Sequence, residues 1–351
     1  MTVVLAVDGG NSKTDLALLE DDGTVLSVVR GPLSSPQHLG VDGSLAVLSG
    51  LLDEACSDAN LDRRSGPVAD VAELLLAGVD FPAEEEAFRA AVKEEHWAVR
   101  VSVRNDTFAV LRAGTERGWG VAVVCGAGIN CVGVAPDGRH ARFPALGQIS
   151  GDWGGGFDVG LGALSAAARS EDGRGPLTTL ERAVPAHFGL SSPLEVAEAI
   201  HRDAIPIRRV VELAPIVFAE AADDPVAKGL VDRLAAEVAD FARAALARLD
   251  LQHDTVEVLL GGGLLQSGDR TLIERIEHDV RSAAPQAIVR AASAPPIVGA
   301  ALLGLDELGS EPAAQHRLRE ELSAAVSSLG QPTIDDPGPE RLNTSAERVD
   351  G

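Results

Sequence analysis

The sequence predicts an α/β protein of two domains, and three observations lead to this prediction. The chain has 351 residues, about twice the length of an ordinary single domain. Short β-branched runs alternate with longer amphipathic runs, which is typical of sheets covered by helices. Three strand-like runs open the chain, and a second set of three begins at Gly120, so the same architecture occurs twice.

The first half reads as three strands followed by alternating helices and strands. The first strand runs into a pair of glycines, and Asp21-Asp22-Gly23 is typical of a hairpin turn between the second strand and the third. Leucines at helical spacing form one face of the first long helix. The predicted elements are strands 3–7, 14–20 and 24–30, helix 42–62, strand 71–77, helix 84–95, strand 98–103 and helix 105–114.

The second half repeats the three strands and then becomes rich in helices. Its clearest helix covers 225–249, whose candidate core residues are Leu230, Leu234, Val238, Phe241 and Leu246. The predicted elements are strands 120–125, 130–135 and 139–143, a helix-rich stretch over 156–249, strand 255–260, helix 269–284, strand 286–289 and helix 297–308.

Composition restricts the kinds of partner. Thirty Lys and Arg face 53 Asp and Glu, a net charge of −23, which argues against nucleic-acid or membrane binding by a broad basic face. Tyr is absent and aromatic residues make up 3%, so stacking platforms for single-stranded nucleic acid are not expected. The sequence shows no basic leader and no long uncharged apolar run, and its three cysteines lack metal-site spacing. We therefore expect a cytoplasmic protein with reduced, buried thiols.

The turn after the first strand carries groups suited to a polyphosphate. Glycine backbone can approach phosphate oxygens closely, and hydroxyl and ammonium groups stand beside it. A carboxylate at the strand end could hold Mg²⁺ through water. The alternative is a solvated hairpin turn, because the Walker spacing is absent. The candidate residues are Asp8 for the metal and Gly9, Gly10, Asn11, Ser12, Lys13 and Thr14 for the phosphates.

Two further glycine turns and one polar loop follow later strands. Each turn by itself could be an ordinary tight turn, but open α/β sheets bind ligands at strand ends, so several together indicate a site. The loop over 147–156 is dense in polar and glycine residues, which suits a hydroxylated ligand. The candidates are Gly126, Ala127 and Gly128, then Gly261, Gly262 and Gly263, and in the loop Gly147, Gln148 and Asp152.

A carboxylate follows the strand over 98–103. Asp106, next to Asn105, has the chemistry of a general base that takes a proton from a hydroxyl during phosphoryl transfer. The alternative is that Asp106 only caps the helix that follows.

These motifs, in this order, resemble the sugar kinases of the actin-like ATPase superfamily. They are similar to the BadF/BadG/BcrA/BcrD ATPase family, which includes N-acetylglucosamine kinases, and the segment Pro296-Ile297-Val298-Gly299-Ala300 matches a late turn of that family. The resemblance covers about residues 1–310. It implies two ribonuclease-H-like domains with ATP, Mg²⁺ and a sugar in the cleft between them.

The resemblance also implies domain limits. The first domain would comprise residues 1–114 and about 299–330, and the second residues 115–298 with a helical insert over about 175–250. Residues 331–351, rich in Pro, Gly, Asp and Glu, read as a mobile tail. Similar kinases are often homodimers, and the insert could supply such an interface.

Roles within the site follow from the same resemblance. ATP phosphates would lie on residues 8–14 and 126–128, and the adenosine by residues 261–263. Asp106 would be the base for the 6-hydroxyl of the sugar. The alternative for His38 is an ordinary loop histidine with no role in binding. The residues expected to bind the sugar are Asn105, Asn130, Gly147, Gln148, Asp152, Ser35, Gln37 and His38.

Two departures from the family pattern bear on the ligands. Ala127 and Ile129 stand where many relatives carry hydroxyl residues, so backbone N–H groups would have to hold the phosphate. The stretch Ala145-Leu146-Gly147-Gln148 lacks the tryptophan that often precedes the Gly-Asp pair in N-acetylglucosamine kinases. It looks more like actinobacterial glucosamine kinases. The prediction is ATP-dependent phosphorylation of D-glucosamine to glucosamine 6-phosphate, with N-acetylglucosamine kinase as the alternative.

Two other classes remain open at the level of sequence. Related ATPases activate acyl-CoA dehydratases and hold an iron–sulfur cluster between subunits, for which Cys125 and Cys131 are the nearby pair. A sugar sensor on a kinase scaffold is the other, but no helix-turn-helix precedes Val3 and a sensor needs no base at Asp106.

Overall fold

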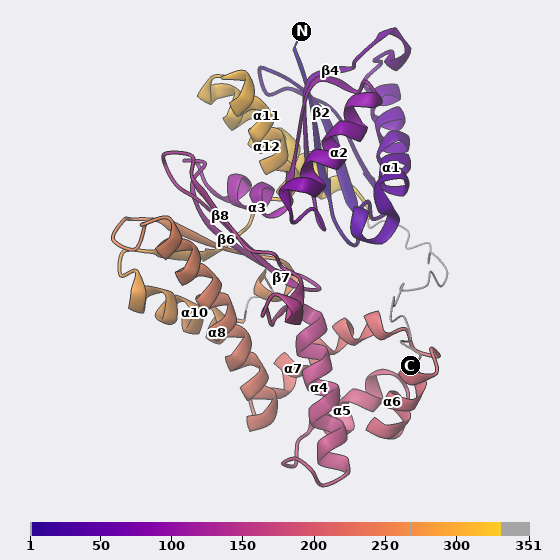
Figure 1. Cartoon of the computed structure of the whole chain (residues 1–351), viewed down its shortest axis with the longest axis vertical. Coiled ribbons are helices and arrows are strands. Elements are labelled where there is room, and N and C mark those ends of the chain that lie inside the picture. The colour runs from indigo at the N-terminus through magenta and orange to yellow at the C-terminus, as the bar shows by residue number, and fades with distance from the viewer. Residues whose placement is uncertain (1, 267–268, 331–351) are drawn as a thin grey trace, which may run out of the picture.

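The computed structural model describes residues 2–266 and 269–330, and it contains two five-stranded sheets flanked by helices (Figure 1). The tail predicted over 331–351 lies outside the described residues. The first sheet comes from the N-terminal part of the chain and the second from the part after Gly120. The α/β class predicted from the alternating pattern is confirmed.

The first sheet brings three strand ends to one edge. Its strand order is β3-β2-β1-β4-β5, in which β1 pairs antiparallel with β2 and parallel with β4, and β4 pairs parallel with β5. The carboxyl ends of β1, β4 and β5 therefore face the same way. The strands are β1 (Val3–Gly9), β2 (Thr14–Glu20), β3 (Val25–Gly31), β4 (Ala69–Leu76) and β5 (Ala98–Asn105).

The second sheet repeats this topology. Its order is β10-β9-β6-β7-β8, with an antiparallel β6–β7–β8 meander and parallel pairing of β6 with β9 and of β9 with β10. The first strand of each unit is central in its sheet, so the predicted repeat is confirmed. The strands are β6 (Gly120–Cys125), β7 (Ile129–Val134), β8 (His140–Arg142), β9 (Glu257–Gly261) and β10 (Ile288–Ala291).

Most helices agree with the sequence pattern, with three exceptions, of which one is the short helix α9 (Gly263–Gln266) that was not predicted. Helix α1 begins at Pro36 rather than at residue 42, with a kink at Gly40, where φ is 68°. Helix α12 was not predicted, because its apolar stripe of Ala314, Leu318 and Leu322 is narrow and lies in a charged segment. The α-helices are α1 (Pro36–Asp58), α2 (Pro82–Glu94), α3 (Thr107–Gly114), α4 (Gly155–Glu171), α5 (Leu180–His187), α6 (Pro193–His201), α7 (Ala214–Glu220), α8 (Pro225–Arg248), α9 (Gly263–Gln266), α10 (Arg270–Ala283), α11 (Pro296–Leu308) and α12 (Pro312–Ser328), and the 3-10 helices are η1 (Arg63–Ser65), η2 (Gly147–Ile149) and η3 (Ile207–Leu213).

Helices α3 and α11 join the two sheets through one hydrophobic core. That core includes Val4 from the first sheet, Val132 from the second, and Phe108 and Ile297 from the two helices. Gly299 allows their close approach, since a Cβ there would lie 1.9 Å from the carbonyl oxygen of Ala109. Although α11 and α12 come last in the chain, both lie beside the first sheet (Figure 1).

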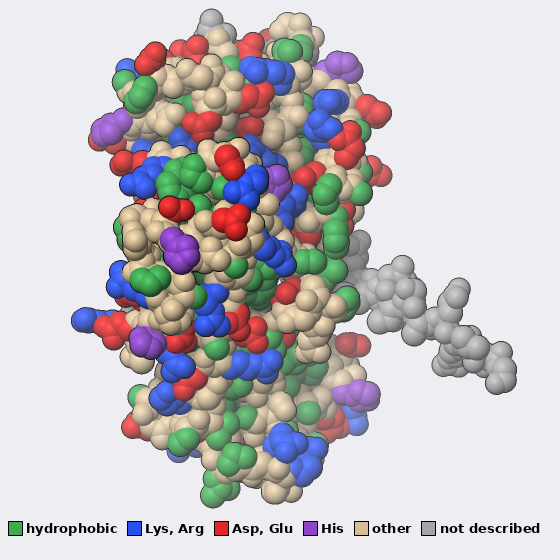
Figure 2. Space-filling model, turned by 60° about the vertical axis from the view of Figure 1, so that its left-hand side comes forward, with side chains coloured by type: hydrophobic (Ala, Val, Ile, Leu, Met, Phe, Trp, Pro, Cys, Tyr) green, Lys and Arg blue, Asp and Glu red, His purple; other side chains and the backbone are tan. Residues whose placement is uncertain are grey.

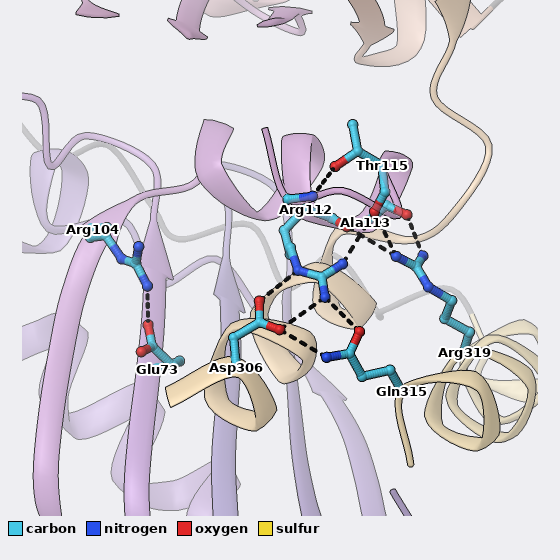
Figure 3. Close-up of polar contacts among 9 residues, drawn as sticks. Glu73, Arg104, Arg112, Ala113, Thr115, Asp306, Gln315 and Arg319 are labelled. Atoms are coloured by element: carbon cyan, nitrogen blue, oxygen red, sulfur yellow. Dashed lines mark hydrogen bonds and ion pairs between the residues drawn. The ribbon is translucent and has the colours of Figure 1, made fainter. Parts of the chain in front are cut away.

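Arginine side chains fix the C-terminal end of α3 (Figure 3). Arg319 on α12 donates to the carbonyl oxygens of Ala113 at 2.6 Å and Thr115 at 2.8 Å, and also to that of Arg112. Free carbonyls at a helix C-terminus favour cationic donors. Hydrogen bonds from α12 therefore fix the position of the segment that connects the first sheet to the second.

Helices α4 to α8 form the part of the molecule most distant from the first sheet (Figure 1). Of the predicted core residues of α8, Leu234, Val238, Phe241 and Leu246 are buried, and Leu230 packs partly buried against them. Acidic and basic side chains are interspersed over the face shown in Figure 2. The helices in the described part of the chain include none with the length and apolarity needed to cross a membrane.

Candidate active site

The three glycine turns open into one cavity of about 770 Å³. The turns come from the β1–β2 hairpin, the β6–β7 hairpin and the start of α9, so both sheets contribute. Apolar side chains from η3 and α7 form the opposite wall. The lining residues are Ser12, Gly126, Ala127, Gly156, Val211, Pro215, Phe218, Ala219, Gly263, Leu264 and Asp269.

Three glycines of the second and third turns, of which Gly126 and Gly263 line the cavity, are not explained by packing within the protein. At Gly126, Gly128 and Gly263 an added Cβ would meet no protein atom within 4 Å, and none of them has a left-handed φ. In contrast, a Cβ at Gly9 would lie 2.5 Å from Leu76, and Gly262 has a φ of 86°. The open positions are those at which a ligand can approach the backbone.

The first turn offers the hydroxyl of Ser12 to the cavity, and the ammonium of Lys13 lies on the same turn. The turn is closed by a bond from the Gly10 N–H to the Lys13 carbonyl at 2.9 Å. Ser12 is exposed, and the Lys13 side chain, 43% exposed, lies 3.2 Å from Asp15. Thr14 is fully buried and its hydroxyl donates to Ser34 Oγ at 2.7 Å, so its side chain stabilises the turn from within the protein.

Three carboxylates gather at the shared edge of the first sheet. Asp8 is on β1, Asp80 follows β4 and Asp106 follows β5. Burial, with the charges of Asp106 and Asp15, raises the pKa of Asp8 to about 8. Burial raises the pKa of Asp106 to about 6, and burial with the charge of Asp106 raises the pKa of Asp80 to about 7. Such a cluster is relieved by a bound cation.

Asp106 does not cap α3. Its side chain accepts no capping hydrogen bond from the described helix. The side-chain oxygen of Asn105 does so instead, accepting from the Thr107 N–H at 3.0 Å and from the Thr107 hydroxyl at 2.6 Å. Asn105 rather than Asp106 thus makes the side-chain cap hydrogen bonds of α3, and a backbone contact with Thr107 only partly offsets the effect of burial on the pKa of Asp106.

Asn105 and Asn130 bring the two sheets together at Asp80. Asn105 Nδ2 donates to Asp80 Oδ1 at 2.8 Å, and Asn130 Nδ2 donates to the same oxygen at 3.3 Å. Asn105 ends a strand of the first sheet, and Asn130 lies on β7 of the second. The two asparagines predicted from the sequence are thus neighbours across the interface.

The sequence motifs missed Asp80 and its neighbour Arg142. Arg142 on β8 donates to the Asp80 carbonyl oxygen at 3.1 Å and lies 2.7 Å from Glu85. It therefore links the second sheet to the loop after β4. Asp80 could have been found by the rule that selected Asp106, since both follow the carboxyl end of a parallel strand.

The polar loop lies beside the β6–β7 hairpin. Asp152 is buried, its N–H donates to the Gly147 carbonyl at 2.9 Å, and its carboxylate accepts from Ser150. The Gly156 N–H donates to the Gly126 carbonyl at 2.8 Å, which ties the end of the loop to the second glycine turn. Gln148 is exposed on this loop.

Residues 35–38 support the loop after β4. Ser35 is fully buried and donates to the Ala77 carbonyl at 2.9 Å, so its hydroxyl is used within the protein. Gln37 is exposed, with its side chain next to Gly78, where a Cβ would lie 2.7 Å from that of Gln37. His38 is exposed.

The three cysteines are free and buried, as expected. Burial raises the pKa of Cys125 to about 12 and also raises that of Cys131. Both thiols lie in the core of the second sheet rather than at a surface that could share a cluster between subunits. Among residues 2–266 and 269–330, no three His, Cys, Asp or Glu side chains form a metal-binding group.

Comparisons with known proteins agree with this architecture. A model of the BadF/BadG/BcrA/BcrD ATPase family matches residues 5–304. The chain is 28% identical over 271 residues to an N-acetylmuramic acid/N-acetylglucosamine kinase of Clostridium acetobutylicum, covering 76% of this chain and 87% of the relative. It is 23% identical to an N-acetyl-D-glucosamine kinase of Dictyostelium discoideum, covering 87% and 98%.

A solved structure shares the fold. The crystal structure of a Chromobacterium violaceum protein, provisionally assigned as an N-acetylglucosamine kinase, superposes with a TM-score of 0.69 at 26% identity. The match covers 86% of this chain and 99% of that one, so it includes both sheets.

Proposed function

The chain belongs to the BadF/BadG/BcrA/BcrD ATPase family, and from this premise we propose that it is an ATP-dependent amino-sugar kinase. The single observation that carries the proposal is the convergence of three glycine turns on one cavity, together with half-buried carboxylates at the edge of the first sheet from which the first of these turns comes. Glycine backbone suits phosphates, and a buried carboxylate suits a hydroxyl nucleophile.

The cavity has features for a nucleotide. Backbone N–H groups at the open positions Gly126, Gly128 and Gly263, with Ser12 and Lys13, would hold the phosphates. The absence of hydroxyl side chains from the second turn leaves this contact to the backbone, as the sequence indicates. The adenine ring of the nucleotide would lie against the apolar wall that η3 and α7 form.

A magnesium ion fits the chemistry of Asp8. Its carboxylate is half-buried, and burial with the charges of Asp106 and Asp15 raises its pKa to about 8, although Lys13 and Arg30 oppose this shift. Oxygen ligands of this kind, with bridging water, are typical of Mg²⁺ with nucleotides. When bound, the ion would neutralise charge on the phosphates.

Asp106 would act as the general base. The proton of the sugar 6-hydroxyl passes to its carboxylate, O6 forms a bond to the γ-phosphorus, and the bond from that phosphorus to the bridging oxygen of ADP breaks. The pKa of about 6 leaves Asp106 ionised near neutral pH, so it can accept this proton.

We propose D-glucosamine as the preferred acceptor, giving glucosamine 6-phosphate. The carboxylates near Asn105 and Asn130 give the sugar side an excess of negative charge, which suits an ammonium group. The polar loop over 147–156 contributes the buried Asp152, and its one aromatic side chain, Trp153, is buried in the core of the second sheet.

N-acetylglucosamine is the second candidate, and a specific observation favours it. Leu146 and Ile149, at the edge of the polar loop, are 39% and 89% exposed, so they could form an apolar wall for an acetyl methyl group. Two related proteins are named as kinases of N-acetylated sugars.

A coupled ADP-release assay tests the proposal. Purified protein, Mg²⁺ and ATP are supplied with glucosamine, N-acetylglucosamine, glucose, mannosamine or galactosamine in turn. We expect sugar-dependent ADP release, with the highest kcat/KM for glucosamine. ADP release that does not depend on any sugar would contradict the kinase proposal, and a preference for N-acetylglucosamine would replace the acceptor while leaving the kinase in place.

A further inference from the structure

Asp80 presents one carboxylate oxygen that the protein does not use. Both amide donors, from Asn105 and Asn130, go to Oδ1. From the residues that the structure describes, no hydrogen bond to Oδ2 is made. The side chain is half-buried, and Oδ2 is not among the buried oxygens that lack a partner, so it is open to a ligand.

The neighbouring charges do not neutralise this oxygen. The charge of Arg142 on the second sheet partly offsets the rise in the pKa of Asp80, but its guanidinium donates to the backbone carbonyl of Asp80 and pairs with Glu85 rather than with the Asp80 carboxylate. Asp106 and Glu84 repel the carboxylate, and together with burial they raise the pKa of Asp80 to about 7. A cationic ligand group at Oδ2 would relieve both the desolvation and the repulsion.

The position of Asp80 relates this oxygen to the acceptor sugar. Asn105 and Asn130 hold Oδ1 from two sides, and Asp106, the proposed base, acts on Asp80 through its charge. An ammonium group is the cation that distinguishes glucosamine from glucose and from N-acetylglucosamine. A carboxylate prefers it to a neutral amide, because hydrogen bonds between charged partners are the stronger ones.

Resting on the proposed kinase function, we propose that Asp80 Oδ2 accepts the C2 ammonium of glucosamine and thereby selects the free amine over the acetamide. Asp80 is then a specificity-determining residue, while Asn105 and Asn130 hold its other oxygen in place. The competing explanation is that Asp80 serves only to position the two asparagines.

Asp80→Asn separates these explanations. The amide keeps an oxygen at the Oδ1 position for Asn105 and Asn130, but it places an NH₂ donor where Oδ2 stood, facing the ammonium. Glu86→Gln is the matched control, since it removes a carboxylate from α2 that is 62% exposed and pairs with Arg89. Both variants and the wild type are assayed for kcat/KM on glucosamine, glucose and N-acetylglucosamine.

We expect Asp80→Asn to lower kcat/KM for glucosamine by about 10- to 100-fold, the worth of a charged hydrogen bond. Values for glucose and N-acetylglucosamine should stay within about twofold, as should all values for Glu86→Gln. Thermal melting and ATP-induced stabilisation check the fold. If Asp80→Asn does not fold, Asp80→Ser is used, and only the ratio of kcat/KM for glucosamine to that for glucose is interpreted, because this variant also removes the contacts to Asn105 and Asn130.

Three outcomes would overturn the assignment. An equal loss on all three sugars would make Asp80 a positioning residue for the asparagines, and no loss on any sugar would remove it from the site. A wild-type preference for N-acetylglucosamine would refute selection of the amine but leave the kinase intact. Absence of wild-type turnover on every sugar is the distinct result that refutes the proposed function itself, and the assignment with it.

Discussion

Arg112 and Asp306 form a two-point ion pair between α3 and α11, with Nε 2.6 Å from Oδ2 and Nη2 3.0 Å from Oδ1 (Figure 3). The Arg112 side chain is only 5% exposed. Gln315 on α12 bonds to both partners. Because α3 begins directly after Asp106, this contact holds in place the helix that follows the proposed base.

Removal of this ion pair should destabilise the fold. Asp306→Ala leaves a buried guanidinium without its carboxylate, so we expect the free energy of unfolding to fall by about 2 kcal/mol. Urea denaturation measures it. The adjacent Glu307→Ala is the control, because Glu307 pairs with the half-exposed Arg100 and should cost about 0–1 kcal/mol. Equal effects of the two substitutions would contradict the role of Asp306 as the partner of the buried Arg112.

Loss of the carboxylate at Asp106 should stop phosphoryl transfer without unfolding the protein. Asp106→Asn is nearly isosteric, and Asn105 rather than Asp106 caps α3, so stability and ATP binding should be retained. We expect kcat to fall by about 10²–10⁴. Melting temperature and ATP binding serve as controls, and near-normal turnover would show that another group accepts the proton.

The rate should fall in mildly acidic solution. Below its pKa of about 6, Asp106 is protonated and cannot take the proton of the sugar hydroxyl. Each further pH unit lowers the ionised fraction about tenfold, and kcat/KM should follow it. Glucose is the suitable acceptor for this profile, because it carries no ammonium for Asp80 to bind. A flat profile between about pH 7 and about pH 5 would contradict the base assignment.

A side chain at Gly126 should block the nucleotide but not the fold. The space around this position is free of protein atoms, so Gly126→Val should fold normally yet raise the KM for ATP at least about tenfold by occupying the path of the phosphates. Gly229→Val on α8 is the control, since it also has free space but lies outside the cavity lining. Unchanged KM values for both variants would place the nucleotide elsewhere.

Much of the fold could be predicted because local signals agree with it. Asp21-Asp22-Gly23 does form the β2–β3 turn, in which Gly23 has a φ of 89° and Asp22 accepts from the Thr24 N–H at 2.9 Å. The β-branched runs form strands, and the second set of three predicted strands forms part of the second sheet. These features depend on neighbouring residues, so they are visible in sequence.

The parts of the site that were missed depend on tertiary placement. Asp80 becomes significant only because β4 lies between β1 and β5, which brings its loop to Asn105. The apolar wall of Val211, Pro215 and Phe218 comes from the helical insert, whose position no local pattern reveals. Thr14 was predicted to bind phosphate, but its burial against Ser34 depends on packing that the local sequence does not reveal.

The central claim is phosphoryl transfer to the 6-hydroxyl of an amino sugar, and nuclear magnetic resonance of the product tests it most directly. Glucosamine, ATP and Mg²⁺ are incubated with the protein, and ³¹P–¹H correlation locates the new phosphate. We predict a phosphomonoester coupled to the C6 protons of glucosamine, absent with Asp106→Asn. A phosphate on another carbon, or conversion of ATP to ADP and free phosphate alone, would contradict the account.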